Sequence, residues 1–114
     1  MKERDIEKYL IARVKALGGE CRKVQWIGRR GAPDRLVMLP GLPGQPFALI
    51  DQGNGISTVQ PLRLATTSRT VFVELKAPGI KPEAHQLREH ERMRAMGQRV
   101  EVIDSIEGVE RLLA

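Results

Sequence analysis

The chain has 114 residues and a formal net charge of +5, and 41% of its residues are hydrophobic while only 4% are aromatic. This length suits one domain with an aliphatic core and is too short for two domains. The one cysteine, Cys21, excludes an internal disulfide and a cysteine-rich zinc site, and we expect it to be a small strand residue.

The amino terminus and the apolar runs predict the compartment. No apolar run approaches the roughly 20 residues that span a bilayer. Residues 2–5 are charged and lead into an amphipathic segment, unlike a signal peptide. We therefore expect a cytoplasmic protein with no membrane contact, and its positive charge makes nucleic acid a candidate partner.

A helix is predicted at residues 3–17, followed by glycines that end it. Its apolar side chains recur at helical spacing: Ile6, Leu10, Val14 and Leu17. Glu3 and Glu7 project onto or beside this apolar stripe, although carboxylates are expected on the opposite face. Acids in the first turns also complement the helix dipole, which is an alternative explanation for Glu3 and a weaker one for Glu7.

Two strands with a basic loop between them are predicted next. The strands cover residues 20–26 and 34–39, and Pro33 sets extended geometry before the second. In the loop at 28–33, glycines allow close approach of the backbone to a ligand, and arginines suit phosphate. A solvated surface loop is the structural alternative.

An insert rich in proline and glycine follows at about residues 40–70. A structureless loop of this length is uncommon in a small domain, so we expect a partly ordered excursion such as an extended hairpin. Residues 47–50 are compatible with a short strand, and residues 51–55 with a turn.

The strand predicted at 71–75 is apolar on both faces, except that Glu74 and Lys76 share one face. A buried carboxylate is unfavourable unless it is paired or bound to metal, and an edge-strand ion pair with Lys76 is the alternative. A helix at 82–96, a strand at 99–103 and a helix capped by Ser105 complete the chain. We interpret the two histidines of the helix at 82–96, His85 and His90, as surface residues.

The predicted order is αβββαβα, with the insert before the third strand. The strand–helix–strand unit at 71–103 implies a parallel pair with a right-handed crossover, and the earlier strands form a meander beside it. We therefore predict one α/β domain over residues 1–114, with a mixed sheet flanked by helices.

Two carboxylates from neighbouring strands can hold a divalent metal against a phosphodiester. Asp34 and Glu74 supply them if their strands are adjacent, and the carbonyl of Leu75 is a further oxygen ligand for Mg²⁺ or Mn²⁺. Lys76 can orient the attacking water and offset phosphate charge. Glu7 could add a carboxylate, and Gln86 could place the lysine or the substrate.

These residues resemble a known family. Gly31-Ala32-Pro33-Asp34, Glu74-Leu75-Lys76 and Gln86 are similar to the motifs of the VRR-NUC (virus-type replication-repair nuclease) group of PD-(D/E)XK nucleases. The resemblance covers nearly the whole chain outside the insert. It implies a restriction-endonuclease-like core and Mg²⁺- or Mn²⁺-dependent cleavage of DNA. Small members from phages or prophages are typically structure-selective homodimers that cleave Holliday junctions.

The resemblance also assigns roles to residues. Asp34 and Glu74 match the metal-binding acids, Lys76 the catalytic lysine and Gln86 the glutamine of the next helix. Glu7 best fits the acid of the first helix, with Glu3 as the runner-up. Asp34 and Glu74 lie further apart in sequence than in the family's usual tight hairpin, which leaves substrate preference open.

The basic residues expected to contact DNA phosphates are Arg22, Lys23, Arg29, Arg30 and Arg35. Paired incision of a junction calls for two sites related by a two-fold axis, which favours a homodimer. Two alternatives stay open: a non-catalytic DNA-binding module on the same scaffold, and an interaction subunit that docks through the insert.

Overall fold

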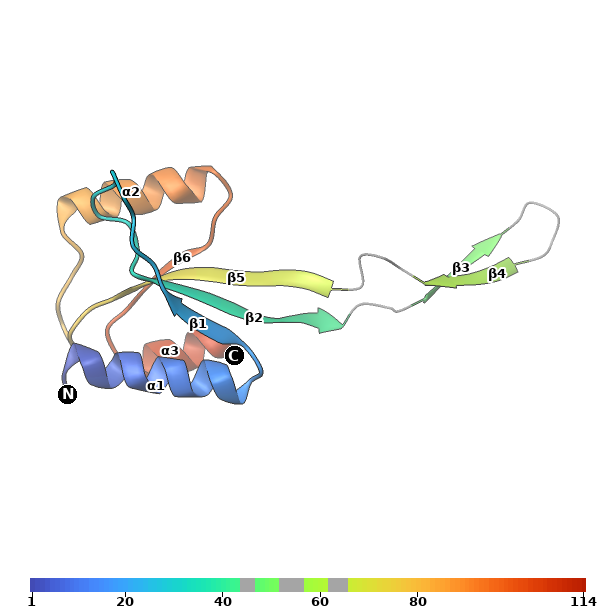
Figure 1. The fold of residues 1–114 in the computed structure, drawn as a ribbon, viewed down its shortest axis with the longest axis horizontal. Coiled ribbons are helices and arrows are strands. Elements are labelled where there is room, and N and C mark those ends of the chain that lie inside the picture. Colours follow the sequence, from blue (N-terminus) through green and yellow to red (C-terminus); the bar gives the residue numbers. More distant parts are fainter. Residues whose placement is uncertain (44–46, 52–56, 62–65) are drawn as a thin grey trace. The chain divides into compact units, whose positions relative to one another are not determined.

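The computed structural model describes residues 1–43, 47–51, 57–61 and 66–114. The chain forms two compact units, one of residues 1–39 and 70–114 and one of residues 40–69. Figure 1 shows the elements of each. No helix in the described part of the chain is long and apolar enough to cross a membrane.

The larger unit is built on a four-stranded mixed sheet in the order β1-β2-β5-β6. The strands are β1 (Glu20–Lys23), β2 (Arg35–Pro43), β5 (Thr66–Leu75) and β6 (Val100–Ile103). β1 is antiparallel to β2, β5 runs against β2 in Figure 1, and β5 and β6 are parallel. The predicted α/β class, mixed sheet and parallel strand–helix–strand unit are confirmed.

Helices cover both faces of this sheet (Figure 1). Helices α1 (Glu3–Ala16) and α3 (Ile106–Leu113) pack on one face, and α2 (Ala84–Ala95) lies on the other. Ser105 caps α3 as predicted, because its Oγ accepts a hydrogen bond from the Gly108 amide at 2.9 Å.

The apolar core lies between the sheet and the helices α1 and α3. Strand alternation sends Val71, Val73 and Leu75 of β5 into this core, where each is at most 2% exposed. The apolar stripe of α1 meets them, except Leu17, which lies past the helix and is exposed. The opposite face of β5 presents Phe72 and Glu74 to α2.

A polar cluster joins the outer surfaces of α1 and α3. The Tyr9 hydroxyl donates to Glu110 at 2.6 Å, and Arg13 Nε donates to the same oxygen at 2.9 Å. These hydrogen bonds hold the Glu110 pKa below its usual range. The two helices are therefore joined by charge-assisted bonds as well as by the core.

The second unit contains a two-stranded antiparallel sheet of β3 (Phe47–Asp51) and β4 (Ser57–Pro61). Its register pairs Phe47 with Pro61 and Asp51 with Ser57. The expected hairpin and the strand at 47–50 are confirmed, and most of the turn expected at 51–55 lies outside the described residues.

Several boundaries differ from those predicted. β1 ends at Lys23 and does not reach residue 26. β2 and β5 extend beyond the predicted strands, to Pro43 and back to Thr66. Pairing between neighbouring strands thus overrides the local preference of proline and glycine for turns.

Candidate active site

Asp34 lies where β2 begins, beside the end of β5. Its side-chain Oδ1 accepts a hydrogen bond from the Leu75 amide at 3.4 Å, and its carbonyl accepts one from the Val24 amide at 2.9 Å. These bonds hold the Asp34 carboxylate against the strand that carries Glu74, as the sequence predicts for adjacent strands.

The loop before Asp34 is fixed by close packing on α2. Gly31 has a positive φ of 84°, and a Cβ there would lie 2.9 Å from the His85 carbonyl oxygen and 3.1 Å from the Gln86 Cα. Pro33 is buried, and its carbonyl accepts a hydrogen bond from Trp26 Nε1 at 2.7 Å. A glycine at position 31 therefore allows the backbone to approach the helix that carries Gln86.

Glu74 is a buried carboxylate, only 6% exposed. Burial and then repulsion by Asp34 raise the pKa of Glu74 from 4.5 to about 7, and attraction by Lys76 opposes this shift. A smaller contribution comes from Glu3. Asp34, Glu74 and Lys76, called here the acidic site, therefore act on one another electrostatically, and the site favours a bound cation.

His90 lies against Glu74, and its interpretation as a surface residue is wrong. Its side chain is fully buried, and Nε2 lies 3.4 Å from Glu74 Oε1. Within the described part of the chain, His90 Nδ1 has no hydrogen-bond partner. Burial, followed by the charges of Arg94 and Lys76, lowers the pKa of His90, so the imidazole is neutral near pH 7.

One feature of the sequence could have predicted that His90 faces the site. His90 follows Gln86 by four residues, and side chains at this spacing lie on the same face of a helix. Gln86 is half-buried, and its Oε1 accepts a hydrogen bond from the Glu83 amide at 2.8 Å as part of the α2 cap. Because His90 contacts Glu74 of β5, the face of α2 that carries Gln86 and His90 is the face that meets β5.

The two acids of α1 have different partners. Glu7 accepts a hydrogen bond from Arg35 Nε at 3.1 Å, and the Arg35 side chain is only 12% exposed. Glu3 is exposed and acts on Glu74 through its charge. The charge of Glu3 therefore acts on the acidic site, whereas Glu7 is paired with Arg35 at the start of β2.

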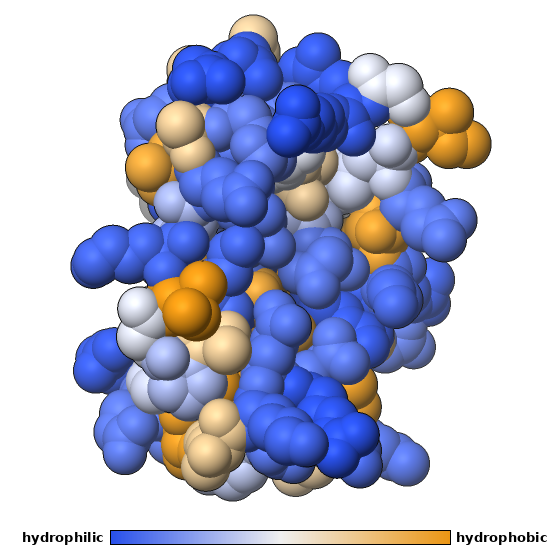
Figure 2. Space-filling model, turned by 90° about the vertical axis from the view of Figure 1, so that its left-hand side faces the viewer, coloured by the Kyte–Doolittle hydropathy of each residue, from blue (hydrophilic) through white to orange (hydrophobic). Residues whose placement is uncertain are grey.

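The remaining basic residues predicted to bind DNA are all exposed. Arg22 pairs with Glu20, and Arg29 pairs with the buried Glu89 at 3.1 Å. Figure 2 shows the end of the larger unit at which α1 and α2 begin, and hydrophilic residues dominate that face. This surface suits a charged ligand.

The donor set fits a hard divalent cation. Among the described residues, no three acidic, histidine or cysteine side chains form a metal-binding group. Mg²⁺ commonly takes one or two carboxylates and keeps several waters, so Asp34, Glu74 and the Leu75 carbonyl would provide enough protein ligands for it. Burial and Asp34 raise the pKa of Glu74, and a bound cation would oppose this shift because it favours the ionised carboxylate.

Comparison with known proteins identifies the family. No family model matches the chain. Over 105 residues the chain is 41% identical to a protein of Acyrthosiphon pisum secondary endosymbiont phage 1 named Putative nuclease p44, and this match covers 92% of the chain and 85% of the relative.

A solved VRR_NUC domain specifies the family. It is similar to this chain with a TM-score of 0.67 and 38% sequence identity, and the match covers 99% of this chain and 95% of that structure. The chain belongs to the VRR-NUC nuclease family. The restriction-endonuclease-like VRR-NUC fold expected from the sequence is therefore confirmed.

Proposed function

We propose that this VRR-NUC domain is an endodeoxyribonuclease that hydrolyses phosphodiester bonds with Mg²⁺ or Mn²⁺. The supporting observation is the meeting of Asp34 and Glu74 at the ends of two neighbouring strands, with the charge of Lys76 acting on Glu74. A nuclease name in a phage relative agrees with this proposal.

Asp34, Glu74 and the Leu75 carbonyl would hold the metal, with one acid of α1 near them. Bound there, the metal would lower the pKa of a water and offset charge on the phosphate. Lys76 would orient the attacking water and offset phosphate charge, and Gln86 would help to place the lysine or substrate. With its proton on Nε2, a neutral His90 would donate a hydrogen bond to Glu74 Oε1 and would hold that carboxylate in its orientation.

Of the two acids of α1, Glu3 is now the better candidate, because its charge already acts on Glu74 whereas Glu7 is paired with Arg35. Glu7 would then hold Arg35 in place beside the site. Phosphates would meet the exposed side chains of Arg22, Lys23, Arg29 and Arg30.

We further propose that branched DNA, such as a four-way junction, is the substrate in repair, recombination or phage replication in the cytoplasm. One active site cuts one strand, so paired incision requires a two-fold symmetric homodimer. Sedimentation at working concentration measures this, and a monomer that makes paired incisions would contradict it.

The cleavage test uses labelled junction, flap, splayed-arm, duplex and single-stranded DNA with Mg²⁺, Mn²⁺ or EDTA. Lys76→Ala should slow cleavage by about 100-fold or more, which is within the usual contribution of a proton-transfer or charge-stabilising group. Lys81→Ala, at an exposed lysine just before α2, is the matched control. Full activity of Lys76→Ala, or cleavage in excess EDTA, would contradict the mechanism.

A further inference from the structure

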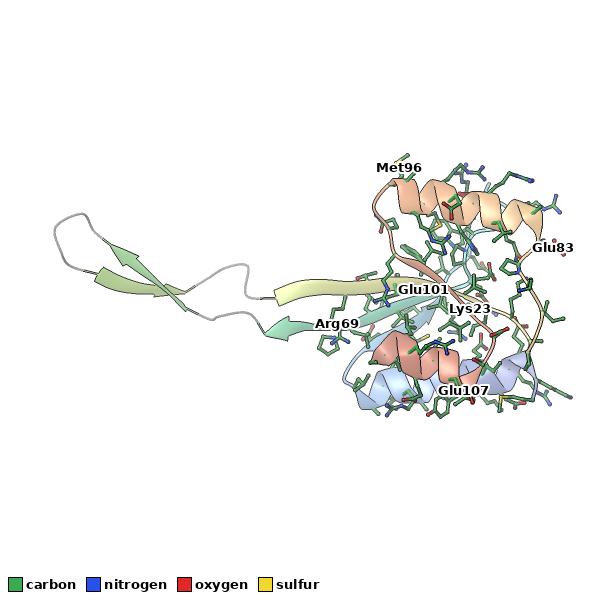
Figure 3. The ribbon with its side chains drawn as sticks, turned by 180° about the vertical axis from the view of Figure 1, so that it is seen from behind. Lys23, Arg69, Glu83, Met96, Glu101 and Glu107 are labelled. Atoms are coloured by element: carbon green, nitrogen blue, oxygen red, sulfur yellow. The ribbon has the colours of Figure 1, made fainter. Side chains whose placement is uncertain are left out.

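A second feature of the α2 face is a cavity of about 560 Å³. Trp26 and Phe72 line it, with ring centroids 5.8 Å apart and planes tilted by 50°. Met93 and Met96, from the carboxyl-terminal end of α2, line it from the helix side. Figure 3 labels Met96 at the end of α2 opposite Glu83. We call this cavity the aromatic pocket.

Two arginines give the aromatic pocket a basic rim. Glu89 is 3% exposed, and its carboxylate binds Arg29 at 3.1 Å and Arg92 at 3.4 Å. Both arginine side chains are 54% exposed, so each guanidinium is anchored on one edge and open to solvent elsewhere. Two positive charges against one negative charge leave this rim attractive to phosphate.

The aromatic pocket adjoins the acidic site along one strand. Phe72 precedes Glu74 by two residues, and alternate residues of a strand share a face. Two residues of strand span about 7 Å. A nucleotide whose phosphate meets Asp34 and Glu74 therefore has a neighbouring base within reach of Phe72.

We propose that the aromatic pocket binds one unpaired nucleobase of the DNA substrate, next to the phosphate that is cut. Flat aromatic bases stack on aromatic side chains, and arginines can meet the adjoining phosphates. A base inside a duplex is stacked and paired, so only a base already freed at a branch enters without unpairing. This inference rests on the proposed nuclease function and supplies a physical basis for branch selectivity.

Trp26 is the only tryptophan of the chain, so its fluorescence reports on the aromatic pocket. The full-length protein is titrated in EDTA with three DNAs: a splayed arm, the same arm with abasic sites at the unpaired positions nearest the branch, and the matching duplex. The splayed arm should quench Trp26 and bind about tenfold more tightly than the abasic arm, because stacking is lost in the latter. Equal quenching by all three DNAs would overturn the proposal.

Two charge-matched variants separate the aromatic pocket from general electrostatics. Met96 is 79% exposed and Leu87, elsewhere on α2, is 48% exposed, so glutamate is tolerated at both positions. Met96→Glu should remove the preference for the splayed arm over the abasic arm, whereas Leu87→Glu should keep it. Equal preferences in the two variants would overturn the proposal. A Met96→Glu protein that changes only its sedimentation would assign the aromatic pocket to contacts between copies of the chain instead.

Cleavage with Mg²⁺ on the same DNAs distinguishes the two proposals. Cleavage without base-dependent quenching would overturn the aromatic pocket and leave the nuclease. Base-dependent quenching without cleavage would support the pocket and overturn the nuclease.

Discussion

Replacing Glu74 by glutamine should stabilise the metal-free protein at pH 8. Burial and the charge of Asp34 raise the pKa of Glu74 from 4.5 to about 7. Below pH 4.5 the carboxyl is protonated in both the folded and unfolded chains, so it adds no pH dependence. Between 4.5 and about 7 the unfolded chain loses the proton first, and the free energy of unfolding therefore falls as the pH rises.

The size of this effect follows from the two pKa values. At 1.36 kcal/mol for each pH unit, ionised Glu74 destabilises the fold by about 3 kcal/mol at pH 8 and about 1 kcal/mol at pH 5. Glutamine has nearly the same shape and no proton to lose. The stability gained by Glu74→Gln should therefore be larger by about 2.5 kcal/mol at pH 8 than at pH 5.

Urea unfolding in EDTA at the two pH values measures this difference and cancels the pH-independent effects of the substitution. Glu101→Gln is the control, because it makes the same change on β6 where the side chain is 45% exposed. Adding Mg²⁺ should then stabilise the unsubstituted protein more than the variant, since the ion binds the folded carboxylate. A gain in stability that is the same at pH 5 and pH 8 would refute the reasoning.

Three further predictions concern the surroundings of this site. His90→Leu should weaken Mn²⁺ binding and slow cleavage by about tenfold, because it removes a hydrogen bond that orients a metal ligand. His90→Gln should keep much of both, because the glutamine amide can still donate a hydrogen bond. Calorimetry measures Mn²⁺ binding, and the cleavage assay measures the rate. Gly31→Ala should lower the free energy of unfolding in urea by about 2–4 kcal/mol, because φ is 84° there and a Cβ would lie 2.9 Å from the His85 carbonyl oxygen. Gly28→Ala is the control and should lower it by about 1 kcal/mol, because φ is 76° but no atom lies within 4 Å of a Cβ. Burial raises the pKa of Cys21 from 9.0, so its reaction with a disulfide reagent should require a higher pH in the folded protein than in guanidinium.

The framework of the site was predictable because short-range patterns determine it. Alternation along residues 71–75 separates Val73 from Glu74, and the strand–helix–strand order places β5 beside β6. The proline before Asp34 marks where β2 begins. Adjacency of β2 and β5 then brings Asp34 to Leu75, as the hydrogen bond at 3.4 Å shows.

The burial of His90 and Glu89 could not be predicted from apolar periodicity, because both are polar residues buried by polar partners. The apolar stripe of α2 is ragged, so periodicity does not reveal which face meets the sheet. Glu89 is buried with Arg29, which lies 60 residues before it in the sequence, and with Arg92, which lies about one turn further along α2. Hydropathy cannot distinguish such a residue from one in solvent, because partners distant in sequence offset its desolvation.

The two faces of β5 have different physical roles. The face of Val71, Val73 and Leu75 is covered by apolar side chains and supplies stability without chemistry. The face of Glu74 is covered by α2, whose contribution includes His90, so a carboxylate is held out of water with one neutral partner and a repelling acid nearby. The burial of apolar side chains on one face of β5 thus offsets the free-energy cost of the buried Glu74 carboxylate on the other face. A cation bound at Glu74 would reduce that cost.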